Sequence, residues 1–206
     1  MRTVFHLLRH ASHGHVGAVL TGRLPAAPLL PAGRQQALAL GKHFVGQKLD
    51  AIYTSPRLRA QQTAEIISRQ TGVESEVAAE LDEIDFGNWS GRSFEELAAD
   101  PEWRRWNEER GAAATPAGDT MEAVGARITG FIDRLRNDFP GHAFALVSHS
   151  DVIKAALCRT FGASFQNVHD FEIAPASITT VSFDKHGPRL VSCNSKPVRS
   201  RLGALV

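Results

Sequence analysis

The sequence predicts an α/β protein in which a mixed, mostly parallel sheet lies between two layers of helices. Three observations carry this prediction. Short apolar runs alternate with helical patterns along the chain, the length of 206 residues suits one domain, and a content of 43% hydrophobic and 22% charged residues is typical of globular proteins. We therefore expect one domain over residues 1–206, with a helical insert at about residues 92–118.

The N-terminal part alternates strands and helices. Residues 3–8 are apolar and β-branched without a polar alternation, as in a strand that is buried on both faces. The segment after the second strand begins with a serine and a proline, residues that favour the start of a helix. The expected elements are a strand at residues 3–8, a helix at 34–48, a strand at 50–54, a helix that Ser55 and Pro56 begin and Gly72 ends, and a strand at 74–78.

The C-terminal part continues the pattern after the irregular insert. Ser93 and Glu96 have the spacing of a capping box and predict the start of a short helix. The expected elements after it are a helix at residues 101–110, a long helix that Asp119 caps and Pro140 ends, a strand at 143–148, a helix at 151–161, and strands at 171–173, 177–183 and 189–193.

Charge and cysteine content exclude several classes of partner. The 23 Lys and Arg residues nearly balance the 22 Asp and Glu residues, so no overall field attracts nucleic acid or an anionic membrane. Cys158 and Cys193 lie far apart and lack metal-ligand spacing, and no apolar run approaches the roughly 18 residues of a membrane span. We expect a cytoplasmic protein with no nucleic-acid or membrane partner; a homodimer is left open.

Histidine and arginine follow the predicted strands where those strands end. Ligands of open α/β sheets bind at the carboxyl ends of the strands, and Arg9, His10 and His149 lie at two such ends. Arg59 is placed four residues after Ser55 and should face a third end. Neutral imidazole is a nucleophile and arginine matches phosphoryl oxygens, so this set favours phosphoryl transfer through a phosphohistidine.

One further arginine and a group of histidines have other interpretations. Arg57 lies at the start of the same predicted helix, and we expect its side chain to extend into water. The close spacing of His10, His13 and His15 permits a zinc site, but the nearest acidic residue in the sequence is Asp50, so we predict no metal. The tryptophans near the insert should be mainly buried, and the insert has the right place in the chain to act as a lid.

The chain also resembles a known family along nearly its whole length. Five segments, taken in order, are similar to motifs of the histidine phosphatase (phosphoglycerate mutase-like) superfamily. They are Leu8-Arg9-His10-Ala11, residues 53–64 (YTSPRLRAQQTA), residues 81–91 (LDEIDFGNWSG), residues 115–119 (TPAGD) and Val147-Ser148-His149-Ser150. The resemblance implies a phosphoglycerate mutase-like fold and a cofactor-independent phosphatase that acts on a small phosphorylated metabolite.

The resemblance also implies roles for individual residues. His10 corresponds to the nucleophile, and Glu83 to the proton donor for the leaving oxygen; the residue pattern alone does not choose Glu83 from Glu80, Asp82, Glu83 and Asp85. The expected catalytic set is completed by Arg9, Arg59 and His149. The expected substrate contacts are Arg9, His10, Arg59, His149, Ser150, Ser12 and Arg23.

Departures from the family pattern bear on the reaction. Ala11 and Ser150 stand where glycine is usual, and the polar residues that many members carry after the first motif are replaced by residues 12–16. Ile84 follows Glu83, so the Glu-Arg pair that resembles the mutases is absent. We therefore favour a phosphatase, with a mutase-type phosphotransferase and a non-catalytic phosphate-binding module as the alternatives.

Overall fold

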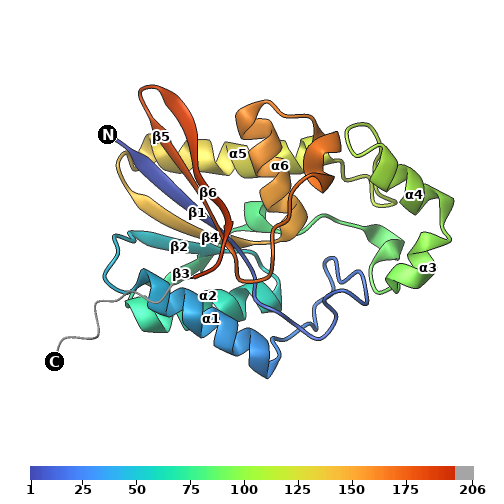
Figure 1. Cartoon of the computed structure of the whole chain (residues 1–206), viewed down its shortest axis with the longest axis horizontal. Coiled ribbons are helices and arrows are strands. Elements are labelled where there is room, and N and C mark those ends of the chain that lie inside the picture. Colours follow the sequence, from blue (N-terminus) through green and yellow to red (C-terminus); the bar gives the residue numbers. More distant parts are fainter. Residues whose placement is uncertain (198–206) are drawn as a thin grey trace.

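A six-stranded mixed sheet forms the centre of the protein (Figure 1). The computed structural model describes residues 1–197. Across the sheet the strands are β3 (Ser75–Val77), β2 (Ala51–Thr54), β4 (Ala143–Ser148), β1 (Thr3–Arg9), β5 (Ile178–Asp184) and β6 (Gly187–Ser195). The pairs between β3 and β1 are all parallel, whereas β5 runs antiparallel to both of its neighbours. The predicted mixed, mostly parallel sheet is confirmed.

Two pairs of helices cover the two faces of this sheet. The helices are α1 (Pro31–Phe44), α2 (Leu58–Thr71), α3 (Phe94–Ala98), α4 (Pro101–Glu108), α5 (Met121–Asp138) and α6 (Ser150–Phe161), with short 3-10 turns η1 (Ala79–Leu81), η2 (Gly87–Trp89) and η3 (Phe165–His169). Helices α1 and α2 pack together on one side, and α5 and α6 on the other. Helices α3 and α4 belong to the predicted insert and lie beyond the end of the sheet (Figure 1).

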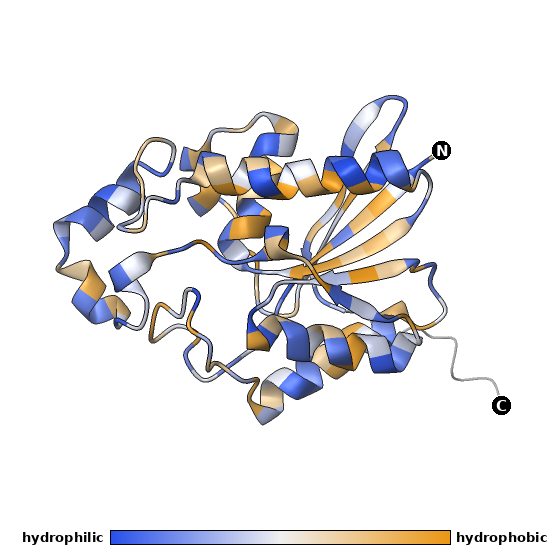
Figure 2. Cartoon of the chain, turned by 180° about the vertical axis from the view of Figure 1, so that it is seen from behind, coloured by the Kyte–Doolittle hydropathy of each residue, from blue (hydrophilic) through white to orange (hydrophobic). Residues whose placement is uncertain are grey.

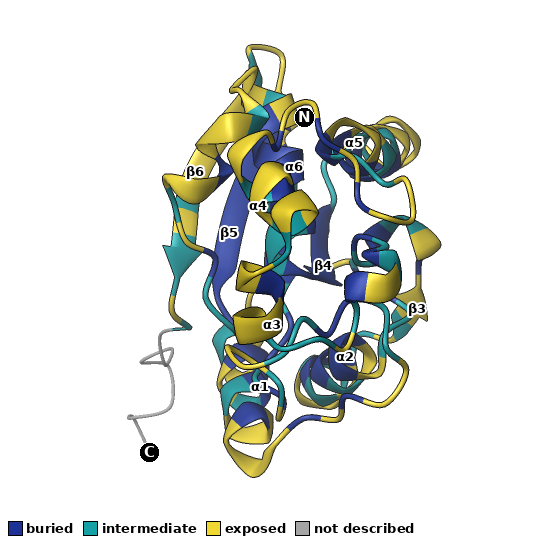
Figure 3. Ribbon diagram, turned by 90° about the vertical axis from the view of Figure 1, so that its right-hand side faces the viewer, coloured by how far each residue is buried: buried dark blue, intermediate teal, exposed yellow. Residues whose placement is uncertain are grey.

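The central strands are mainly apolar because both of their faces are covered. In β4, Phe144 and Leu146 join the core under α5 and α6, while Ala145 and Val147 join the core under α1 and α2. The hydrophobic colour of the strands in Figure 2 and the deep burial of β4 and β5 in Figure 3 show the same arrangement. Strand β6, at the edge, is largely exposed.

A close backbone contact sets the position of the loop that follows β1. A Cβ atom on Gly33 would lie 2.0 Å from the carbonyl oxygen of Ser12, so only glycine allows this approach of α1 to the loop. The Ser12 amide also donates a hydrogen bond to Gln36 in α1. The start of α1 therefore supports the residues directly after His10.

Three predicted helix boundaries were wrong. Helix α1 starts at Pro31 and ends at Phe44, because proline suits the first helical position and Gly46 adopts a left-handed φ of 78° after the end. Helix α2 starts at Leu58, because Arg57 keeps an extended ψ of 135° although the Ser55 hydroxyl accepts the Arg57 amide. The cap of α5 is Thr120, whose hydroxyl accepts the Ala123 amide.

One predicted strand does not form. Residues 171–173 form no strand, and the Ile173 carbonyl instead accepts a hydrogen bond from Arg9. The helix predicted at residues 101–110 ends at Glu108. The capping box of Ser93 and Glu96 and the end of α2 at Gly72 are confirmed.

No helix within residues 1–197 combines the length and the apolar character that a membrane crossing needs.

Candidate active site

The carboxyl ends of β1, β2 and β4 meet at a pocket of about 270 Å³. Arg9, His10 and Arg59 line it together with Glu83, which arrives on the loop after η1. His149 is fully buried and lies behind Arg59, to which it is hydrogen bonded. The structure thus brings together five residues that the sequence predicted as a catalytic set.

The partners of His10 select one tautomer of its imidazole. Nδ1 lies 2.9 Å from the carbonyl oxygen of Ala11, which can only accept a hydrogen bond, so Nδ1 carries the proton. Nε2 accepts a hydrogen bond from Arg59 Nε at 3.2 Å and therefore carries the lone pair. Burial and the charges of Arg59 and Arg9 hold the pKa of His10 well below its usual value of 6.5. The imidazole is neutral and has the lone pair that a nucleophile needs.

Two arginines supply positive charge with unused hydrogen-bond donors. Arg59 is buried and donates to His10, His149 and the Gly22 carbonyl, but its Nη1 has no partner among residues 1–197. Arg9 donates to the Ile173 carbonyl through Nη1, and its buried Nε is also without a partner in the described part of the chain. Buried donors without partners are costly, and an anion bound between the two arginines would satisfy them.

Glu83 has the electrostatic character of a proton donor. Burial raises its pKa to about 7, although the charge of Arg59 acts in the opposite direction. Its Oε1 accepts the Ile84 amide, and its Oε2 lies 3.4 Å from His149 Nδ1 and 3.8 Å from Arg59 Nη2. A carboxyl group with a pKa near 7 can give and take a proton at neutral pH.

The outer wall of the pocket contains polar groups that the sequence analysis missed. Arg110 is 5% exposed, pairs with Asp151 at 3.3 Å, and lies 4.8 Å from the ring centre of Trp106. Asn107 accepts a further hydrogen bond from Arg110. Ser150 lines the same region. No local pattern marks Arg110, because the chain brings it to the pocket only through the packing of the insert.

Three predicted substrate contacts do not line the pocket: Ser12, Arg23 and His149, which lies behind Arg59. Ser12 is not among the residues that line the pocket, because its backbone faces α1. Arg23 is also absent from the lining, since three carboxylates hold it: Asp82, Asp85 and Asp119. Arg23 therefore holds the loops behind the pocket together and does not line the pocket.

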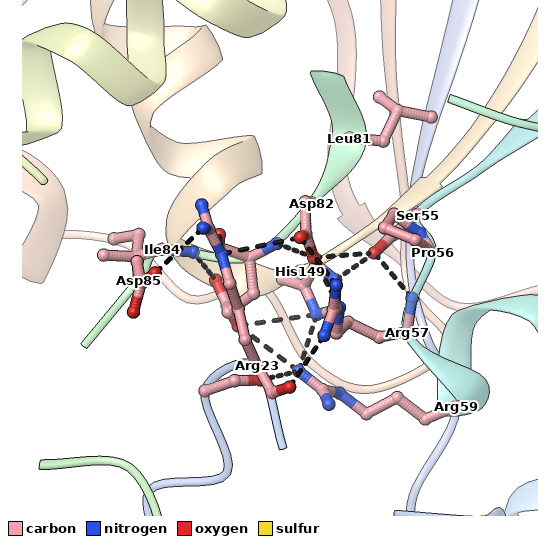
Figure 4. A network of polar contacts seen from close by, with 12 residues as sticks. Arg23, Ser55, Pro56, Arg57, Arg59, Leu81, Asp82, Ile84, Asp85 and His149 are labelled. Carbon is pink, nitrogen blue, oxygen red and sulfur yellow. Dashed lines mark hydrogen bonds and ion pairs between the residues drawn. The ribbon is translucent and has the colours of Figure 1, made fainter. Parts of the chain in front are cut away.

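The expectation that Arg57 extends into water was wrong. Its side chain is 22% exposed, and its Nε and Nη2 lie 2.7 and 2.9 Å from the carboxylate of Asp82. Its Nη1 donates to the Arg23 carbonyl at 2.7 Å. Arg57 thus joins the same network behind the pocket as Arg23 (Figure 4).

The histidines after His10 do not form a metal centre with acidic residues. The ring of His13 lies 5.2 Å from that of His10 and 6.1 Å from that of His15, measured between centroids. Within residues 1–197 no group of three His, Cys, Asp or Glu side chains is arranged to hold a metal ion. His13 lines the pocket, where it is a second imidazole beside His10.

The tryptophans divide between core and pocket. Trp89 and Trp106 are buried at 2% and 0% exposure, as expected. Trp103 packs edge-on against Trp89 with centroids 5.3 Å apart and lines the pocket. The insert therefore contributes an aromatic wall to the site.

Comparisons with known proteins agree with this geometry. Residues 5–196 match the model of the histidine phosphatase superfamily, branch 1. Phosphoserine phosphatase 1 of Hydrogenobacter thermophilus is 29% identical over 164 residues, which cover 79% of this chain and 78% of the relative. The adenosylcobalamin/alpha-ribazole phosphatase of Escherichia coli is 24% identical over 195 residues, which cover 93% and 96%.

A solved structure supports the same fold. A mutant phosphoserine phosphatase from Entamoeba histolytica, in complex with phosphoserine, is 27% identical to this chain and has a TM-score of 0.85. The match covers 94% of this chain and 98% of the other.

Proposed function

The chain belongs to the histidine phosphatase superfamily and is a phosphomonoester hydrolase, and we propose that it acts through a phosphohistidine formed on His10. The observation that carries the proposal is the neutral His10 imidazole, whose lone pair on Nε2 lies beside two arginines with unused donors. A nucleophile next to preorganised positive charge is what transfer of an anionic phosphoryl group requires.

The first step forms a bond between His10 Nε2 and phosphorus. The phosphoryl oxygens take the free N–H groups of Arg9 and Arg59, and Arg59 then releases the lone pair of Nε2. As the new N–P bond forms, the bond from phosphorus to the leaving oxygen breaks, and the proton of Glu83 passes to that oxygen. The products of this step are an alcohol, a phosphorylated His10 and an ionised Glu83.

The second step returns the protein to its starting state. A water molecule attacks phosphorus, the N–P bond breaks, and the electron pair returns to His10 Nε2. Glu83 takes the proton from the attacking water, which restores its protonated form. The pKa of about 7 suits both directions of this transfer at neutral pH.

The dimensions and walls of the pocket favour a small polar substrate. Its volume of about 270 Å³ suits a small phosphorylated metabolite. Arg110, Asp151 and Ser150 give the outer wall polar groups for the leaving alcohol, and Trp103 gives it an aromatic side. Phosphoserine and alpha-ribazole phosphate, the compounds that the names of the two relatives indicate, belong in the first substrate panel together with 3-phosphoglycerate and sugar phosphates.

Trapping the intermediate tests the mechanism. When the wild-type reaction is stopped early with labelled substrate, we expect phosphate on a histidine linkage that is stable to base and labile to acid. His10→Ala should lose both this label and turnover. His186→Ala, which changes an exposed histidine in the turn between β5 and β6, is the matched control. Turnover by His10→Ala near the wild-type rate would refute the proposal.

A further inference from the structure

One buried carboxylate is connected to both the proposed proton donor and His149 (Figure 4). Asp82 is 8% exposed, and its Oδ1 accepts the Glu83 amide at 2.8 Å. The same oxygen lies 3.5 Å from the Ser55 hydroxyl, which in turn lies 2.7 Å from His149 Nε2. Asp82 does not line the pocket, so any influence on the reaction must pass through these neighbours.

The directions of these hydrogen bonds follow from the partners. His149 Nδ1 faces Arg59 Nη2 at 3.1 Å, which can only donate, and Glu83 Oε2 at 3.4 Å, which can donate when Glu83 is protonated. With Glu83 protonated, Nδ1 therefore carries the lone pair and Nε2 carries the proton. Nε2 therefore donates to Ser55 Oγ, and the Ser55 hydroxyl proton is free to be donated to Asp82. The chain from Asp82 through Ser55 thus accepts the Nε2 proton and, together with Arg59, favours the tautomer whose lone pair on Nδ1 faces Arg59.

The main chain of Glu83 is held on both sides. Its amide donates to Asp82, and its carbonyl accepts Arg23 Nε at 2.9 Å. Arg23 is held in turn, because its Nη1 donates to Asp85 and its Nη2 to Asp119. Lysine cannot make these three separate bonds, since they require the planar fork of a guanidinium group.

The charge of Asp82 is balanced without help from the pocket. Arg57 binds both of its oxygens, at 2.7 and 2.9 Å, and Arg23 Nε lies 3.5 Å from Oδ2. A phosphate that enters the pocket therefore need not compete with Asp82 for Arg9 or Arg59. The carboxylate can keep the same hydrogen bonds throughout the reaction.

We propose that Asp82 is a positioning residue that holds Glu83 in place for proton transfer and, through Ser55, fixes the tautomer of His149. The proposal rests on the assignment of Glu83 as the proton donor. Arg23, from the loop after β1, completes the arrangement by holding the Glu83 carbonyl. Arg23 was expected to contact the substrate, and in this proposal it supports the proton donor Glu83 instead. A displacement of about 1 Å at a reacting group can lower a rate about 10²-fold, so the loss of the hydrogen bonds that hold Glu83 should lower the rate measurably.

The leaving group separates positioning from a general structural role. Asp82→Asn should lower kcat for an alkyl phosphate by about 10². A nitrophenyl phosphate needs little proton donation, so its kcat should fall by about tenfold or less through the change at His149. KM should stay within about twofold for both, because Arg9 and Arg59 keep their contacts. Glu80→Gln is the matched control, since Glu80 pairs with Arg134 outside the site and lies two residues from Asp82.

Two further measurements keep the test valid if Asp82→Asn folds poorly. The double variant Asp82→Asn, Arg57→Gln removes both charges of the ion pair and should show the same preference for the activated substrate. In Ser55→Ala, nitrogen-15 NMR of labelled histidine should show that the Nε2-protonated tautomer of His149 is less populated, because only Arg59 then favours it. The hydrogen bond from the Glu83 amide to Asp82 remains in this variant.

The outcomes distinguish the proposal from the function on which it rests. Equal loss of activity toward both substrates in the Asp82 variants, or an unchanged His149 spectrum in Ser55→Ala, would overturn the positioning role. If instead the wild-type protein forms no phosphohistidine with any substrate, the proposed function fails, and the NMR result still decides whether Ser55 fixes the His149 tautomer.

Discussion

Replacing Glu83 with glutamine should remove the proton donor and keep the shape of the site. The amide keeps the size of the side chain, and its oxygen can still accept the Ile84 amide as Glu83 Oε1 does. General-acid catalysis contributes about 10² to 10⁴ in rate, so kcat/KM for an alkyl phosphate should fall by that factor. An activated nitrophenyl phosphate should lose far less, because its leaving oxygen needs little protonation.

The pKa of Glu83 sets the pH at which the donor is lost in the wild-type protein. With a pKa of about 7, about half of the molecules carry the proton at pH 7 and about one in a hundred at pH 9. The donor acts only when protonated, so kcat/KM for the alkyl phosphate should fall about tenfold per pH unit above 7. In Glu83→Gln this decline should disappear.

The ratio of the two substrates isolates this effect. Above pH 7 both substrates are largely dianions, because the second pKa of a phosphate monoester is about 6 or lower, so their own ionisation contributes little to the ratio of their kcat/KM values. Rapid-quench measurement of the phosphorylation burst excludes the second step, in which Glu83 acts as a base. A ratio that stays constant from pH 6 to 9 in the wild type, or equal losses for both substrates in Glu83→Gln, would contradict the role of Glu83; Glu80, Asp82 and Asp85 would then be tested in the same way.

Three other predictions concern stability and cofactors. The pKa of Glu83 rises from 4.5 to about 7 on folding, so its stabilising contribution is present below pH 4.5 and is lost as the pH rises through 7. Glu83→Gln should therefore raise the free energy of unfolding by about 3 kcal/mol at pH 8 and by little at pH 4, measured by urea denaturation. Gly33→Ala should lower both Tm and activity, because its Cβ would lie 2.0 Å from the Ser12 carbonyl; unchanged values would show that α1 can move without cost. Treatment with EDTA should leave activity unchanged, because Arg9 and Arg59 supply the positive charge at the phosphate; a loss that zinc restores would contradict this prediction.

Much of the sheet and the centre of the site could be predicted from the sequence because their signals are local. Residues 143–147 are apolar throughout, and the structure buries every one of them in β4 together with Ser148. The histidines and arginines that follow buried strands had to meet at one edge, because parallel strands bring their carboxyl ends together. The choice of Glu83 among the neighbouring acidic residues came from family resemblance, since nothing in the residue pattern distinguished it.

Side chains whose partners lie far along the chain could not be assigned in this way. Arg23 was expected to contact substrate and Asp119 to cap a helix, yet the two form an ion pair across 96 positions. Arg110 gave no signal at all, although packing of the insert places it in the pocket wall.

Periodicity and capping describe interactions over a few residues, and these determined the strands, the helices and the strand-end location of the chemistry. The carboxylate that each arginine binds depends on the distances between loops. Those distances are set only when the two helical layers have packed on the sheet. The sequence by itself therefore determined that His10, Arg9, Arg59 and His149 would meet. Only the tertiary structure decided that Asp82 and Arg23 would hold the main chain of Glu83. Burial removes water from these two charged side chains, so each of them forms ion pairs with the opposite charges that lie near it.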